Sequence, residues 1–220
     1  MCFSAPASFV GSAVIGGIGA AAQKKVIRPD QRLFALIPML FAVQQLAEGV
    51  IWITLASGSY QALETVAAYV FLVPALVLWP AVVPLSVLLM EESKLRKIML
   101  ALLLAAGGAV SVFYLYCLVF FNITPQIHGM HIMYAEDFPR VWMNAFYPVY
   151  IIATIAPLFI SSVRRMWVFG VLIGVSYLAA SIFFSDYLIS VWCFFAAIIS
   201  GVIYWILASA NATSHGEVLS

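Results

Sequence analysis

Charged residues are scarce in this sequence. Asp, Glu, Lys and Arg make up 9% of its 220 residues, whereas 65% of the residues are hydrophobic. A soluble domain carries roughly 25% charged residues, because water must solvate its surface. So few charges exclude a water-exposed globule of this size and indicate a surface that faces lipid. The formal net charge is only +1, which excludes a basic field that would attract nucleic acid.

Several motifs of well-known chemistry are also lacking. No Walker motif, dinucleotide-binding fingerprint or GxSxG sequence occurs. The apolar stretches contain no lysine that could hold retinal as a Schiff base, and no row of histidines that could hold a haem. These absences exclude those chemistries and leave a small number of polar residues within the apolar stretches as candidates.

Long apolar stretches are what the sequence has in abundance. Crossing the hydrocarbon of a bilayer takes about 20 predominantly apolar residues. We therefore predict an all-α fold: a single domain over residues 1–220, forming a bundle of seven transmembrane helices in a lipid bilayer. The third stretch contains Pro74, Pro80 and Pro84, which predict a kink or a steep tilt. The predicted spans are about 3–22, 33–55, 63–90, 98–121, 143–162, 166–184 and 187–208.

The basic residues predict how the bundle is oriented. Of the ten basic residues, only Arg140 lies outside one set of alternate loops. By the positive-inside rule, the N-terminus is then outside and the C-terminus inside. This orientation places the longest loop, at about 122–142, on the outer side. The basic residues that share the inner side are Lys24, Lys25, Arg28, Arg32, Lys94, Arg96, Lys97, Arg164 and Arg165.

Glu48 is the clearest functional candidate, because it lies within the second stretch. An ionisable side chain at that depth costs at least a few kcal/mol, so it should face the bundle interior and have a partner. Gln44 and Trp52 lie four residues to either side, on the same helical face, and Gln45 lies beside them. Burial favours the protonated carboxyl unless a cation or metal compensates. We expect a loop histidine, a metal or a bound cation as its partner; a neutral Glu bonded to a neighbouring helix is the alternative.

Thiol and imidazole groups are predicted on the same outer side. Cys2 begins the first stretch, and Cys193 lies fewer than two turns into the last one, beside Trp192. The outer loop contains His128 and His131, which share one face if that segment is helical. Thiolate and imidazole are ligands for Cu or Zn. Cysteines that pack as small hydrophobes, a disulfide, and solvated loop histidines are the alternatives.

Three short motifs carry a resemblance to a family. The chain opens Met1-Cys2-Phe3-Ser4-Ala5, continues with Gln44-Gln45-Leu46-Ala47-Glu48-Gly49, and has Val191-Trp192-Cys193 near its end. It resembles an uncharacterised family of small bacterial integral membrane proteins that open MCFSA or MCWSA. The resemblance implies a bacterial cytoplasmic (inner) membrane and supplies no activity. The motif positions that it marks are Cys2, Gln45, Glu48, Trp192 and Cys193.

Three functions follow from these residues, and whether the protein is an enzyme is left open. The leading hypothesis is an outward-facing site that binds Cu or Zn, for metal handling or thiol/metal redox chemistry. The second is a channel or transporter for protons or a small solute, with Glu48 as the titrating group. The third is an accessory subunit of a larger membrane complex, and a homo-oligomer is a further option. The metal ligands would be Cys2, His128, His131 and Cys193, and the proton- or ligand-binding group Gln44, Gln45, Glu48, Trp52 and Trp192.

Overall fold

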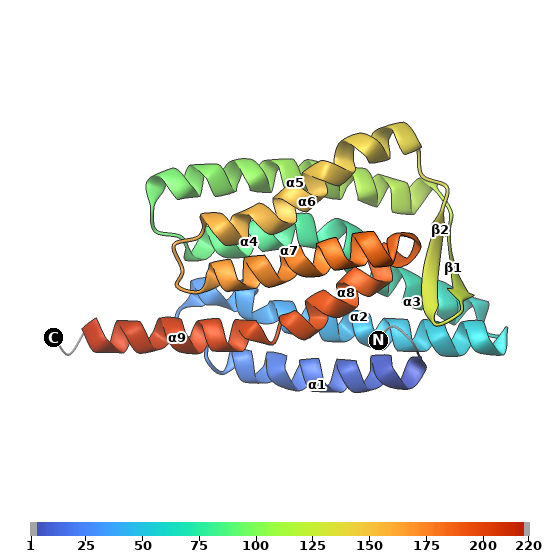
Figure 1. Ribbon diagram of the computed structural model, residues 1–220, viewed down its shortest axis with the longest axis horizontal. Helices are drawn as coiled ribbons and strands as arrows, with labels where there is room; N and C mark the ends of the chain where they lie inside the picture. The colour runs from blue at the N-terminus through green and yellow to red at the C-terminus, as the bar shows by residue number, and fades with distance from the viewer. Residues whose placement is uncertain (1–3, 218–220) are drawn as a thin grey trace.

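The computed structural model describes residues 4–217 and is a bundle of helices with one small hairpin (Figure 1). Most of the long helices run nearly along the long axis of the molecule. The first and last helices are neighbours, although they are far apart in the sequence. The elements are α1 (Ala5–Gln23), η1 (Pro29–Gln31), α2 (Arg32–Ser57), α3 (Gln61–Leu72), η2 (Val73–Leu78), α4 (Trp79–Met90), α5 (Lys94–Phe120), β1 (Ile123–His128), β2 (His131–Glu136), α6 (Arg140–Ile160), α7 (Met166–Phe183), η3 (Ser185–Tyr187), α8 (Leu188–Ile199) and α9 (Val202–Glu217).

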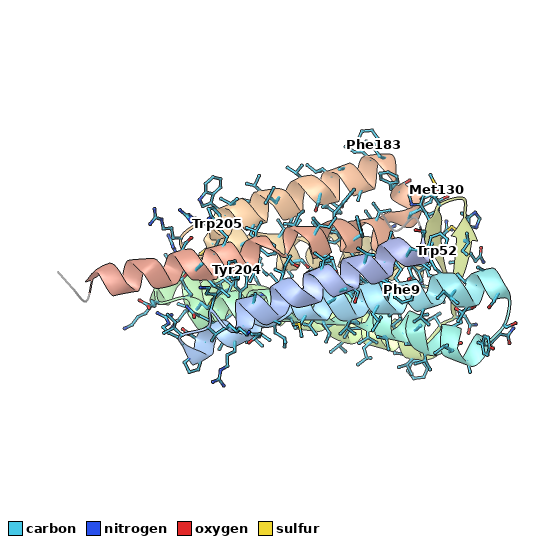
Figure 2. All side chains as sticks on the ribbon, turned by 90° about the horizontal axis from the view of Figure 1, so that it is seen from below. Phe9, Trp52, Met130, Phe183, Tyr204 and Trp205 are labelled. Carbon is cyan, nitrogen blue, oxygen red and sulfur yellow. The ribbon has the colours of Figure 1, made fainter. Side chains whose placement is uncertain are left out.

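Within residues 4–217, seven helical segments are long and apolar enough to cross a membrane. This number confirms the seven helices predicted from the sequence, and lipid contact follows from their composition. Large apolar side chains cover the outside of the bundle: Phe183 and Trp205 project from it (Figure 2), with 76% and 43% of their surfaces exposed. Such an exterior is typical of an integral membrane protein. Insertion and orientation stay predictions.

The two ends of the bundle carry different links between helices. At one end lie the β1–β2 hairpin and the links from α2 to α3 and from α7 to α8; we call it the hairpin end (Figure 1). At the other end lie the links at residues 24–31, 91–93 and 161–165, which hold or adjoin most of the basic residues. We call it the basic end.

Helix α2 is the central element of the bundle. In its most apolar 18-residue stretch, within Pro29–Ser57, 67% of the residues are buried, against 22% in the corresponding stretch of α1. The polar residues Gln44, Gln45 and Glu48 are fully buried on α2. A polar side chain on α2 therefore meets protein rather than lipid, as predicted for Glu48.

The proline-rich third stretch contains a π-helical segment, η2, where the sequence predicted a kink or a tilt. Trp79 donates its backbone N–H to the carbonyl of Pro74, five residues back. The same spacing would pair residue 80 with the Ala75 carbonyl, but Pro80 has no N–H to donate. The hydroxyl of Tyr150, on α6, donates to the Ala75 carbonyl instead, at 2.5 Å. A carbonyl left free by proline thus joins α6 to the third span.

The all-α prediction missed one element, because the expected outer loop contains a β-hairpin. Strands β1 and β2 pair antiparallel through a two-residue turn at Gly129 and Met130. Gly129 has φ +62°, a conformation that glycine adopts without strain and that tight hairpin turns require. On β2, Ile132 and Tyr134 alternate with more exposed neighbours and are buried against the helices.

The last predicted span, 187–208, is also divided. It begins with the short 3₁₀ turn η3, continues as α8, and is interrupted at Ser200 and Gly201 before α9. Gly201 lies against the Ile18 side chain of α1. The segment Ser185–Ser209 as a whole is still long enough to cross a membrane.

Candidate functional site

The Glu48 side chain is fully buried between α2 and α8. Ser190, in the first turn of α8, donates its hydroxyl to Glu48 Oε1 at 2.5 Å. Gln45 lies one turn before Glu48 on α2, and its Nε2 is 3.4 Å from Glu48 Oε2. The predicted interior position of Glu48 is thus confirmed, and a serine hydroxyl and an amide are among its partners.

Gln44 connects α2 to three other segments. Its Nε2 donates to the Phe71 carbonyl on α3 at 3.0 Å and lies 3.8 Å from Cys193 Sγ on α8. Its Oε1 accepts a hydrogen bond from Trp79 Nε1, on α4, at 3.2 Å. One side chain therefore satisfies groups on three neighbouring segments and holds Cys193 close to the Glu48 face of α2. Gln44 is a positioning residue in this arrangement.

Two cavities lie next to this buried group, the larger between the hairpin and the helices and the smaller among the helices alone. The larger, about 190 Å³, is lined near the hairpin by Tyr134 and Glu136 and near α8 by Ser190. The smaller, about 40 Å³, is lined by Tyr150, Trp192 and Cys193. We treat them as one pocket, because both are lined by Leu76, Tyr114, Tyr147, Leu188 and Ile189.

Ser190 is the link between the pocket and the buried carboxyl. Ser190 is among the residues that line the larger cavity, and its hydroxyl donates to Glu48. Glu48 is not among the residues that line either cavity. A proton passing between the pocket and Glu48 therefore has a hydroxyl to pass through, which makes this arrangement suited to proton exchange.

The hairpin supplies an acidic residue to the mouth of the pocket. Ile132, Tyr134 and Glu136 lie on one face of β2, because strand residues two apart share a face, and all three line the larger cavity. Desolvation by the surrounding protein raises the pKa of Glu136 above its ordinary value. Asp186, on η3, is the second acid that lines this cavity.

Several buried polar groups near Glu48 or in the pocket wall make no hydrogen bond to any described residue. Nε1 of Trp192, a residue that lines the smaller cavity, and Nε1 of Trp52, one turn beyond Glu48 on α2, are two of them. Gln45 Oε1, beside Glu48, is a third. Buried polar atoms in folded proteins usually have partners. Trp192 lines the smaller cavity, whereas Trp52 and Gln45 line neither cavity.

The predicted metal ligands do not form a group of three or more in the described structure. Cys193 is buried and free beside Gln44, whereas His128 is exposed at the hairpin turn and His131 stacks on the Tyr187 ring at 4.7 Å. Burial lowers the pKa of His131, which favours the neutral imidazole. Cys2 lies outside the described residues. Within residues 4–217, no group of three or more His, Cys, Asp or Glu side chains could hold a metal.

The two histidines do not lie on a helical turn, as the sequence suggested they could. They face each other across the hairpin, in register on β1 and β2. The other described cysteine, Cys117, is also buried and free, so it forms no disulfide with Cys193. A Cu or Zn site that includes Cys2 stays a prediction.

Sequence reasoning missed three residues of the site: Ser190, Glu136 and Trp79. Ser190 lies three residues before Cys193, the spacing of neighbours on one helical face, and that spacing was its only signal. Glu136 had a signal in the alternation from Ile132 to Glu136 after a glycine turn, which is typical of a strand. Trp79 had no signal in the sequence, because its contact with Gln44 joins helices that are distant in the sequence.

Comparisons with known proteins give a family and no activity. No curated protein and no solved structure matches the chain. A family model matches residues 1–217, and it describes a family of unknown function, DUF6629. The match covers nearly the whole chain and confirms the predicted membership of an uncharacterised family, while the bacterial origin and the three motifs stay predictions. The chain belongs to the DUF6629 family of unknown function.

Proposed function

We propose that this protein is a membrane carrier for a small solute, which enters the pocket at the hairpin end and is coupled to protonation of Glu48. The observation that carries the proposal is the hydrogen bond from Ser190 to Glu48, because Ser190 also lines the pocket. A fully buried carboxyl that meets a pocket through one hydroxyl is suited to proton exchange. This is the second of the functions predicted from the sequence.

The groups around Glu48 can accommodate both of its charge states. With Gln45 Nε2 facing Glu48 Oε2, as in the structure, the amide donates and suits an ionised carboxylate. Rotation of the amide would present Gln45 Oε1, which has no hydrogen-bond partner among the described residues, to a protonated carboxyl. The hydroxyl of Ser190 can donate or accept. A proton can thus be gained or lost without leaving a mismatched pair of donors or acceptors.

The basic residues support an orientation for the carrier. If the basic end faces the cytoplasm, as the positive-inside rule indicates, the pocket faces outward. The solute would then enter from the outside, which in a bacterial inner membrane is the periplasm. Labelling of Cys193 by a thiol reagent added from one side tests this orientation in sealed vesicles.

Proton flux in proteoliposomes tests the proposed function. We expect Glu48→Gln, which keeps the shape and removes the titrating group, to reduce pH-gradient dissipation at least about tenfold. Glu64→Gln is the matched control, because Glu64 lies on α3 and does not line this pocket. A Glu48→Gln protein that still conducts protons at the wild-type rate would contradict the proposal.

The metal-binding hypothesis predicts a different result for the same purified protein. It requires near-stoichiometric Cu or Zn in gently purified protein and its loss from a Cys2→Ser, Cys193→Ser double variant. The carrier requires neither, and we expect the double variant to retain Glu48-dependent flux. Elemental analysis and flux measured together therefore separate the two functions.

A further inference from the structure

The residues that line the pocket indicate the chemical class of its ligand. We propose that the pocket binds a small organic ammonium cation that also carries a hydrogen-bond acceptor. This inference rests on the proposed carrier function, because it names the solute. Size, charge, aromatic lining and one unused hydrogen-bond donor support it.

The size of the pocket limits the ligand to a small molecule. Its larger cavity has about 190 Å³ and its smaller cavity about 40 Å³. An engineered cavity of about 150 Å³ in another protein accommodates benzene, so the larger cavity here suits a ligand of about six to ten non-hydrogen atoms. A nucleotide, a disaccharide or a lipid does not fit within it.

The charge of the lining favours a cation. Glu136 and Asp186 line the larger cavity, and none of the described residues that line either cavity is Lys, Arg or His. His131, which stacks on the pocket residue Tyr187, is held toward its neutral form by burial. Acidic groups at the mouth of a low-dielectric cleft raise the local concentration of cations and exclude anions.

Aromatic side chains form the inner walls. Tyr114 and Tyr150 meet edge to face with ring centroids 6.0 Å apart, and Tyr150 meets Trp192 at 6.1 Å. Tyr147 lines both cavities beside them. Faces of Tyr and Trp rings attract ammonium groups, and alkylated ammonium is recognised by groups of aromatic side chains. A metal ion or a strongly hydrated inorganic cation would gain little from such walls.

Trp192, which lines the smaller cavity, has a ring N–H with no acceptor among the described residues. Trp192 Nε1 makes no hydrogen bond to any described residue, and only 9% of the Trp192 surface is exposed. The hydroxyls of Tyr150 and Tyr147 are already engaged, with the Ala75 carbonyl and with the Tyr177 hydroxyl at 2.9 Å. The ligand should therefore bring an acceptor, such as a hydroxyl, to Trp192, while its ammonium group lies among the tyrosines and the mouth acids.

Calorimetric titration of the full-length protein in detergent tests the ligand class. Choline has a quaternary ammonium and a hydroxyl, and 3,3-dimethyl-1-butanol is its neutral isostere, with carbon in place of nitrogen. We expect choline to bind at least about tenfold more tightly than the isostere. The double variant Glu136→Gln, Asp186→Asn should reduce that preference, and because both residues lie at the exposed mouth, it should fold normally.

The acceptor is tested with Trp192→Phe, which keeps an aromatic ring and removes the donor. This variant should weaken choline binding about fivefold and leave tetramethylammonium, which has no acceptor, unchanged. Equal binding of choline and its isostere would overturn the cation inference while leaving the carrier intact. Binding of none of the three probes would overturn the inference too. The carrier itself would be overturned only by a separate result, proton flux in Glu48→Gln at the wild-type rate.

Discussion

The basic end and the hairpin end of the bundle each contain a buried acidic residue, in contrasting surroundings. At the basic end, Glu91 is 1% exposed and accepts four hydrogen bonds: from the backbone of Glu92 and Ser93, and from the backbone and hydroxyl of Ser162. At the hairpin end, Glu48 is bonded by Ser190 and Gln45, and unpartnered donors and acceptors lie around it.

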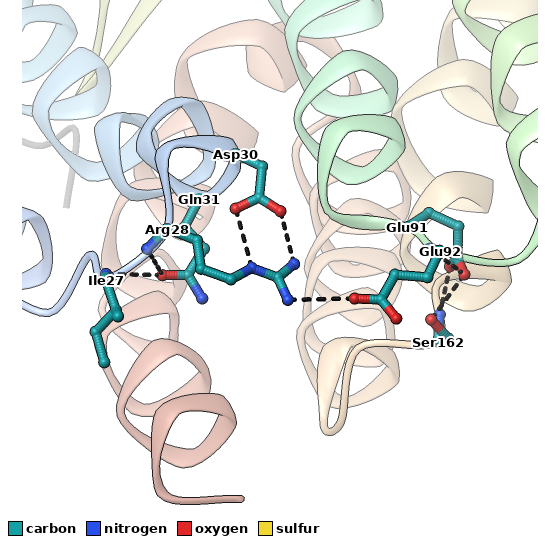
Figure 3. A network of polar contacts seen from close by, with 7 residues as sticks. All are labelled: Ile27, Arg28, Asp30, Gln31, Glu91, Glu92 and Ser162. Atoms are coloured by element: carbon teal, nitrogen blue, oxygen red, sulfur yellow. Dashed lines mark hydrogen bonds and ion pairs between the residues drawn. The ribbon is translucent and has the colours of Figure 1, made fainter. Parts of the chain in front are cut away.

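The network at the basic end ties together three links between helices (Figure 3). Glu91 joins the α4–α5 link to Ser162 in the α6–α7 link. Arg28, in the α1–α2 link, forms ion pairs with Asp30 at 2.6 Å and with Glu92 at 3.2 Å. Such a network fixes the helix ends, whereas the hairpin end keeps polar groups available. The proposed carrier therefore has a tied end, where the network lies, and an end with a pocket.

The largest loss of stability should come from breaking the close packing of α4 against α5, between the two ends. A Cβ added at Gly107, on α5, would collide with the Pro80 carbonyl, which is backbone and cannot swing aside. We expect Gly107→Ala to destabilise the fold by about 3 kcal/mol in thermal unfolding. Gly108→Ala is the matched control, because nothing lies within 4 Å of that position and alanine favours helix. Equal effects of the two substitutions would contradict this packing.

The substitution Glu91→Gln should have the next largest effect on stability. The amide replaces one acceptor oxygen with a donor that faces the donors on Ser162, so we expect a loss of about 2 kcal/mol. Glu92→Gln is the control: Glu92 is 80% exposed in its ion pair with Arg28, and such surface pairs contribute less than about 1 kcal/mol. If Glu92→Gln proved as harmful as Glu91→Gln, the basic end would depend on surface charge rather than on the buried carboxylate.

A pair of tryptophan substitutions compares a satisfied donor with an unsatisfied one. Trp79→Phe removes the donor to Gln44 Oε1 and should cost about 1 kcal/mol more than the lost ring area. Trp52→Phe removes a donor with no hydrogen-bond partner among the described residues, so it should cost only the lost ring area. Chemical denaturation of both variants measures the difference. A larger loss for Trp52→Phe would mean that its N–H has a partner in the folded protein.

The smallest effects should appear in the pH dependence, with opposite signs at the two ends. Burial alone would raise the pKa of Glu91, but the hydrogen bonds from Ser162, Ser93 and Glu92 lower it below its ordinary 4.5. The stability that Glu91 contributes is therefore present above pH 4.5 and is lost as the pH falls through its folded-state pKa. The pKa of Glu136 is raised, so its contribution is present below pH 4.5 and is lost as the pH rises.

Thermal unfolding between acid and neutral pH measures both contributions. The charged side chains closest to Glu91 are those of Glu92, its neighbour in the chain, and of Arg28, which pairs with Glu92 and Asp30. Asp186 lines the same cavity as Glu136. Glu91→Gln should flatten the acid side of the stability curve. Glu136→Gln should flatten the decline in stability above pH 4.5. This change should be less than about 1 kcal/mol, because the side chain is exposed. Unchanged curves in both variants would contradict the assignments.

The sequence was sufficient to predict the spans and the buried carboxyl. Long apolar stretches predict helices because the bilayer leaves the backbone no other partners, and Glu48 within such a stretch had to face protein. The hairpin was missed because six-residue strands give a weak signal within a loop. The pocket was missed because its walls come from helices distant in sequence, so that no local pattern brings Ser190 to Glu48 or Tyr150 to Ala75.

Infrared spectroscopy of the protein in vesicles tests most directly whether Glu48 exchanges a proton with the pocket. A protonated buried carboxyl has a carbonyl stretch distinct from that of a carboxylate. We expect this band in wild type and in Glu64→Gln, its absence in Glu48→Gln, and its loss when the pH on the hairpin side is raised. A band that is present in Glu48→Gln, or that never responds to pH, would contradict a proton-exchanging Glu48.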